Sequence, residues 1–163
     1  MNKDVTQLLK CLNTHKHLYG ILLEKCEEKR RVIIANDINK LEELLAEEQD
    51  LIKRIEAVEG LRIKYSQEAA ARLGLKKDAS HDEIMARDKE AAAAFGNVST
   101  EIKALLTRLK DLNGVNNALI QKRLIYIEDI KSSFFDDRGS NYGSDGKDSG
   151  VKIQNLNLFD RMV

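Results

Sequence analysis

The sequence predicts an all-α protein: an elongated antiparallel bundle of about three long helices with coiled-coil packing, followed by a flexible C-terminal tail. Charged residues make up 33% of the 163 residues, and the chain has no proline and no tryptophan. Proline would interrupt long helices, and β-rich domains carry more aromatic side chains than the 5% found here. Apolar residues also recur at three-, four- and seven-residue steps, the spacing of helices packed side by side.

The first helix is expected over residues 3–35. Apolar side chains recur there every seven residues, at Val5, Leu12, Tyr19, Cys26 and Ile33. The next two residues are Asn36, which tolerates the left-handed conformation that ends helices, and Asp37, which caps helix starts. We expect a turn at this point, with a kink in one continuous helix as the alternative.

Two further helices complete the expected domain of residues 1–135. Residues 38–73 carry a second leucine-rich heptad series, and Gly74 after it suits a helix end. Ser80 and Glu83 then form the S-x-x-E pattern of a capping box, in which each residue satisfies a backbone N–H of the other. This pattern predicts the start of a third helix over residues 81–135.

The third helix carries two apolar stripes. The first is a seam that continues from Ile84 through Asn116 to Tyr126 and Ile130. The second has a residue every seven positions, at Leu106, Asn113, Ile120, Ile127 and Phe134. A helix with two stripes packs against two neighbours, or keeps one stripe for a partner. Asn116 either sets the register of the bundle or helps to select that partner.

Residues 136–163 form the expected tail. Residues 136–150 are polar and rich in glycine, and they bury too little apolar surface to offset the entropy lost on ordering. The last stretch, residues 151–163, is apolar again but without helical spacing. An apolar end on a flexible tether either recognises a partner or folds back on the bundle.

Charge and hydropathy exclude several classes of protein. The 27 basic and 27 acidic residues cancel, so no net field attracts nucleic acid. No apolar run reaches the length needed to cross a bilayer, and the N-terminus lacks the pattern of a secretion signal. We therefore expect a cytoplasmic protein without membrane insertion.

Catalytic chemistry finds no support in the sequence. Cys11 and His15 are four residues apart, but no second cysteine–histidine pair completes a zinc site. The paired E-x-x-H motifs of di-iron bundles are absent, and no stretch fits a phosphate-binding or calcium-binding loop. We expect no catalytic residues, no metal and no cofactor, and therefore an interaction protein rather than an enzyme.

Three stretches of the chain resemble the FlgN-like flagellar export chaperones of the bacterial type III secretion system. They are VIIANDINKLEELLAEEQDLIKRIEAVEGLR at 32–62, LKDLNGVNNALI at 109–120 and YGSDGK at 142–147. In that family they correspond to a leucine-rich second helix, an asparagine-containing pattern in the last long helix, and a Y-G-x-D-G element after it. The resemblance covers nearly the whole chain in the expected order.

The resemblance implies a chaperone that binds hook-associated proteins 1 and 3, prevents their premature association and delivers them to the export gate. It implies that the last long helix and the tail contain the cargo-binding surface, and in the helix Asn113, Asn116, Asn117 and Leu119 match the family pattern. It also implies docking on the cytoplasmic domain of the gate protein, where the tail residues Tyr142, Gly143, Asp145 and Gly146 match.

The apolar stripe fits such a role. Its members Leu106, Ile120, Ile127 and Phe134 are expected to receive an amphipathic helix from the C-terminal segment of the cargo. Without cargo, a second copy of the chain is a possible occupant of this stripe. The alternative function is a helical coiled-coil scaffold or adaptor without an export role.

Overall fold

The computed structural model describes residues 3–135, which fold into four helices joined by short connections. Helix α1 spans Lys3–Ala35, α2 spans Ile38–Arg72, α3 spans His81–Arg87 and α4 spans Lys89–Phe135. No strand occurs within this range, so the all-α prediction is confirmed. The division into a helical domain over 1–135 and a tail over 136–163 stays a prediction, because the tail lies outside the described residues.

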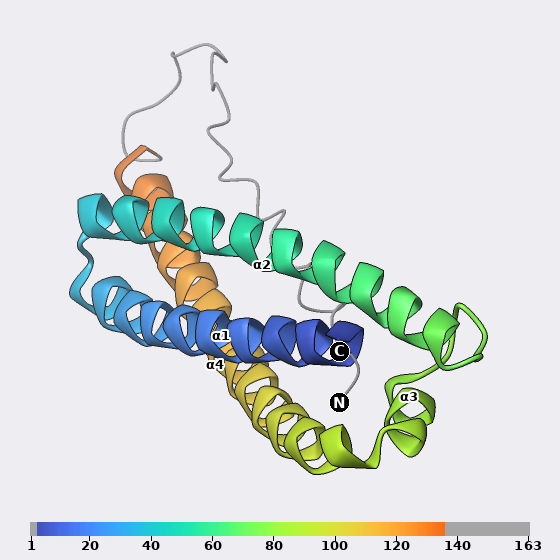
Figure 1. Ribbon diagram of the computed structural model, residues 1–163. Helices are drawn as coiled ribbons and strands as arrows, with labels where there is room; N and C mark the ends of the chain where they lie inside the picture. The colour runs from blue at the N-terminus through green and yellow to red at the C-terminus, as the bar shows by residue number, and fades with distance from the viewer. Residues whose placement is uncertain (1–2, 136–163) are drawn as a thin grey trace.

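Helices α1 and α2 form an antiparallel hairpin, so the expected turn is present in place of a kink (Figure 1). Asn36 adopts the left-handed φ of 58° that ends α1, and the N–H of Asp37 donates to the Val32 carbonyl at 3.2 Å. The Asp37 carboxylate then accepts a hydrogen bond from the backbone N–H of Lys40 at 3.1 Å, which caps α2.

The connection from α2 to α3 also follows the predicted signals. Gly74 ends α2 with a left-handed φ of 69°, a conformation that glycine adopts without steric cost. The capping box opens α3: the N–H of Glu83 donates to Ser80 Oγ at 3.2 Å, and the N–H of Ser80 donates to Glu83 Oε2 at 2.7 Å.

The prediction of one continuous helix over residues 81–135 is wrong. The chain breaks at Asp88, whose φ of −124° and ψ of 83° are not helical, and α4 then starts in a new direction (Figure 1). The Asp88 carboxylate accepts a hydrogen bond from the Ala91 N–H at 3.2 Å and so caps α4. The apolar pattern crosses this break because Ile84 and Ala91, on either side of it, are both buried.

Helix α1 lies between α2 and α4 and makes the principal interfaces with both. One apolar cluster joins the first half of α1 to the end of α2, to α3 and to the start of α4. A second cluster joins the middle of α1 to Leu51 and Ile55 of α2 and to Leu109 of α4. Because α4 crosses α1 obliquely (Figure 1), the finer prediction of three-helix coiled-coil packing stays a prediction.

Candidate partner-binding surface

The first two thirds of α4 pack against the other helices of the bundle. Leu109 is completely buried in the second apolar cluster, and half-buried side chains pack around it at Leu105, Leu106 and Leu112. Leu106, which was expected on a partner-binding stripe, therefore packs against the protein's own core. This part of α4 is a structural element that holds the rest of the helix in place.

Two asparagines of α4 also face α1. The Asn116 side chain is fully buried, and its Nδ2 donates to the Cys26 carbonyl at 2.9 Å. Its Oδ1 has no hydrogen-bond partner among the described residues. Asn113 Oδ1 lies 4.0 Å from Cys26 Sγ. The structure thus places Asn116 in the interface between α1 and α4, where a buried amide favours one register.

A buried ion pair lies beside these asparagines. Lys29 Nζ of α1 donates to Glu48 Oε2 of α2 at 2.8 Å, and both side chains are only 9% exposed. Cys26 Sγ donates to Glu48 Oε1 at 3.5 Å. Burial, together with the nearby Glu48 charge, raises the pKa of the Cys26 thiol to about 12. The thiol therefore stays protonated at neutral pH and is a poor nucleophile.

The solvent exposure of α4 increases after Ile120. Every residue from 121 to 133 is exposed, and we call this stretch the exposed α4 segment. It contains five large apolar side chains that are 38% to 62% exposed: Leu124, Ile125, Tyr126, Ile127 and Ile130. Exposed apolar side chains in this density are typical of a surface that binds another molecule.

For two of these side chains, the prediction that they lie in the bundle seam is wrong. Tyr126 and Ile130 were expected to continue the bundle seam, but they are 62% and 38% exposed. Both residues follow Arg123, the position at which α4 contacts the last turn of α1. Arg123 Nη2 donates to the Ile34 carbonyl at 2.9 Å and ties α4 to the end of α1.

An open groove with a volume of about 670 Å³ lies between α1 and α4, next to the exposed α4 segment along the helix. Leu23, Leu112 and the 45% exposed Val115 supply apolar walls. Three arginines also line the groove: Arg30, Arg31 and Arg108. No local pattern in the sequence predicts this groove, because its α1 and α4 residues are about 80 positions apart.

The remaining predicted site residues differ in their positions. Asn117, Leu119 and Ile120 are half-buried, and Ile127 is exposed. Phe134 lies in the last turn of α4. The predicted gate-docking residues Tyr142, Gly143, Asp145 and Gly146 lie outside the described residues.

Leu124 was missed by the sequence prediction and belongs with the stripe. Ile120, Leu124 and Ile127 follow at four- and three-residue steps, which places them on one face of α4. This spacing suits contact with one apolar face of a second helix. The exposed α4 segment and the groove before it form the candidate partner-binding surface.

Comparison with known protein families gives a match over most of the chain. The model of a family described as FlgN protein matches residues 1–150. No curated protein and no solved structure matches the chain. Within residues 3–135, no helix combines the length and the apolar character that a membrane span requires.

Proposed function

This chain belongs to the FlgN protein family, and from that premise we propose that it is a cytoplasmic export chaperone for the flagellar hook–filament junction proteins. The family is one of chaperones in flagellum biogenesis that bind flagellar proteins. The proposed cargo is the C-terminal segment of hook-associated proteins 1 and 3. The chaperone would keep these proteins from associating before they reach the export gate.

The exposed α4 segment is the observation that carries the proposal for the cargo site. Its five large apolar side chains are held at the end of a helix that Leu109 anchors in the core. An amphipathic cargo helix would cover these side chains and lose its own exposed apolar face. Cargo is then masked without any change in the apolar core, because none of these five side chains belongs to either apolar cluster.

The tail is proposed to contact a second partner. Residues Tyr142, Gly143, Asp145 and Gly146 would dock on the cytoplasmic domain of the export gate protein. A docking element that follows the cargo helix in the chain allows one molecule to hold cargo and gate together. Such tethering raises the effective concentration of cargo at the gate.

Replacing Ile127 by glutamate is expected to weaken binding of a hook-associated C-terminal segment at least tenfold, or about 1.4 kcal/mol. The substitution puts a charge into an apolar contact. Ile127 is 45% exposed in the free protein, so its replacement is expected to leave thermal stability nearly unchanged. Isothermal titration calorimetry with the purified full chain measures the affinity.

The matched control is Ile63→Glu, because Ile63 of α2 is also a helical isoleucine and is 44% exposed. This control is expected to bind cargo like the unmodified protein. Equal binding by all three proteins would exclude the exposed α4 segment as the cargo site. Absence of binding to any filament or junction protein would favour the scaffold or adaptor function instead.

The tail is tested separately with Tyr142→Ala. This variant is expected to reduce secretion of the junction proteins and cell motility, while its calorimetric affinity for cargo stays unchanged. Loss of cargo affinity would contradict the assignment of the tail to the gate. Unchanged motility would contradict the docking role of Tyr142.

A further inference from the structure

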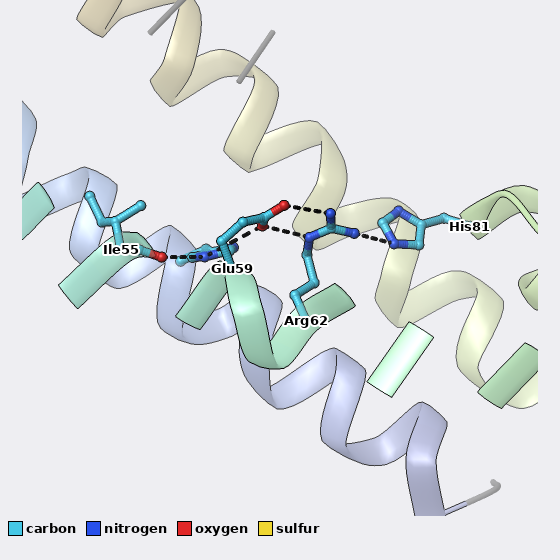
Figure 2. Close-up of polar contacts among 5 residues, drawn as sticks. Ile55, Glu59, Arg62 and His81 are labelled. Carbon is cyan, nitrogen blue, oxygen red and sulfur yellow. Dashed lines mark hydrogen bonds and ion pairs between the residues drawn. The ribbon is translucent and has the colours of Figure 1, made fainter. Parts of the chain in front are cut away.

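Polar side chains from three helices form a row at the α1–α2–α3 junction (Figure 2). His15 lies on α1, Glu59 and Arg62 on α2, and His81 is the first residue of α3. The row lies far from the exposed α4 segment in the sequence, and the proposed function does not use it. Its contacts join α1 to α2, between His15 and the Ile55 carbonyl, and α2 to α3, between Arg62 and His81.

The hydrogen bonds fix the protonation state of His81. Arg62 donates twice to the Glu59 carboxylate, from Nε at 2.7 Å and from Nη2 at 2.6 Å. Its third nitrogen, Nη1, lies 2.7 Å from His81 Nε2 (Figure 2). A guanidinium group has donors only, so His81 Nε2 must accept this hydrogen bond. The His81 ring is therefore neutral in this arrangement.

A proton on His81 Nε2 would turn the acceptor into a donor and place two positive charges in contact. The charged groups near His81 are Arg62 and Glu59 of α2 and Asp82 of its own helix, while α4 presents the Phe95 ring at 5.1 Å. Burial lowers the pKa of His81, and the Arg62 charge lowers it further, against the opposing effects of Glu59 and Asp82.

Protonation would affect His15 differently, although His15 belongs to the same row of polar side chains. Its Nε2 lies 3.3 Å from the Ile55 carbonyl, an acceptor, so this nitrogen carries the proton and donates. A second proton would enter at Nδ1 and leave that hydrogen bond intact. Glu59 Oε2, 3.9 Å from His15 Nε2, would then face the added positive charge. Protonation therefore breaks a contact at His81 but not at His15.

Helix α3 depends on few contacts. It has only seven residues, and its two buried side chains, Ile84 and Met85, join the first apolar cluster. The Arg62–His81 hydrogen bond links the start of α3 to α2. We propose that His81 is an acid-sensitive clasp, whose protonation separates it from Arg62 and releases α3 from the end of the bundle.

The direction of the pH effect follows from the closed arrangement. The pKa of His81 is lowered there from its ordinary value of 6.5, so release of α3 goes with proton uptake. The clasp therefore has its full strength above about pH 6.5 and weakens as the pH falls below that value. Burial would raise the pKa of Glu59, but the hydrogen bonds and the charge of Arg62 hold this pKa below 4.5. Glu59 therefore stays charged through this range.

Hydrogen–deuterium exchange on the full chain tests the clasp at about pH 7.5 and about pH 5.5, with rates corrected for the intrinsic effect of pH. Peptides that cover residues 81–87 are expected to lose protection several-fold at the lower pH. In His81→Gln, whose amide oxygen still accepts from Arg62, this loss is expected to disappear. His17→Gln alters the exposed histidine of α1 and is expected to behave like the unmodified protein.

Two results would overturn the proposal: equal protection of residues 81–87 at both pH values, or a full loss that persists in His81→Gln. If residues 81–87 are unprotected at both pH values in His81→Gln, the test is the titration of His81 in the unmodified chain, measured by nuclear magnetic resonance. A midpoint below 6.5 that coincides with the loss of protection supports the clasp. A midpoint at or above 6.5 refutes it.

Discussion

Replacing Glu48 by alanine is expected to lower the free energy of unfolding by about 3–5 kcal/mol. The change leaves Lys29 charged and buried without the carboxylate that accepts its hydrogen bond at 2.8 Å. Transfer of a lone ammonium group out of water is unfavourable, so the protein must either let water reach Lys29 or move the lysine outward. Urea unfolding followed by circular dichroism measures the loss.

The adjacent residue provides the control. Glu47 also pairs with a lysine of α1, Lys25, but the two side chains are 46% and 30% exposed. Glu47→Ala is therefore expected to change stability far less than Glu48→Ala, because water solvates the remaining lysine. The double variant Lys29→Met with Glu48→Leu removes both charges and is expected to recover most of the loss. Equal effects of the two alanine variants would contradict the assignment of Lys29–Glu48 as a buried pair.

Replacing Leu109 by alanine is expected to lower the free energy of unfolding by about 3 kcal/mol, within the range of about 2–5 kcal/mol for buried leucines. Leu109 is completely buried, and its cluster draws on α1, α2 and α4 together. A cavity at this point removes contacts from all three helices at once. The same urea experiment measures this change.

Leu112, one turn further along α4, supplies the comparison. It is half-buried at the edge of the same cluster, so Leu112→Ala is expected to have a clearly smaller effect. Because Leu109 holds the helix that carries the exposed α4 segment, Leu109→Ala is also expected to weaken binding at the proposed cargo site near the unfolding transition but not far below it. A stability loss no larger than that of Leu112→Ala would show that α4 is not anchored at Leu109.

The helices could be predicted from the sequence because their signals are local. The turn at Asn36 and Asp37 and the capping box at Ser80 and Glu83 each involve residues within three to five positions. The break at Asp88 has a local signal as well, since aspartate is a common N-cap residue. It was missed because the apolar spacing continues across it.

The polar contacts between helices could not be predicted in this way. Charged residues form 33% of the chain, so the sequence permits many ion pairs of which the fold selects a few. Lys29 and Glu48 are 19 positions apart, as are Arg62 and His81. Only the antiparallel packing of α1 and α2, and the position of α3 at the end of α2, bring these groups together.

The candidate site shows a related limit. Periodicity correctly placed Ile120 and Ile127 on one face of α4, and Leu124 belongs to the same face. It could not indicate where the facing helix ends, so Tyr126 and Ile130 were assigned to the bundle. The residues of an apolar stripe can be identified from the sequence of the helix that carries it. Which helix covers each residue depends on the lengths and positions of the other helices.

The exposed α4 segment has a consequence for how this protein can change over time. Most substitutions in a protein are limited by the stability that they remove. Residues 121–133 are all exposed, so substitutions there are expected to escape most of that limit. Under the proposed function, a lineage could therefore alter its cargo preference in this segment while the apolar core of the bundle stays as it is, and recognition could evolve separately from folding.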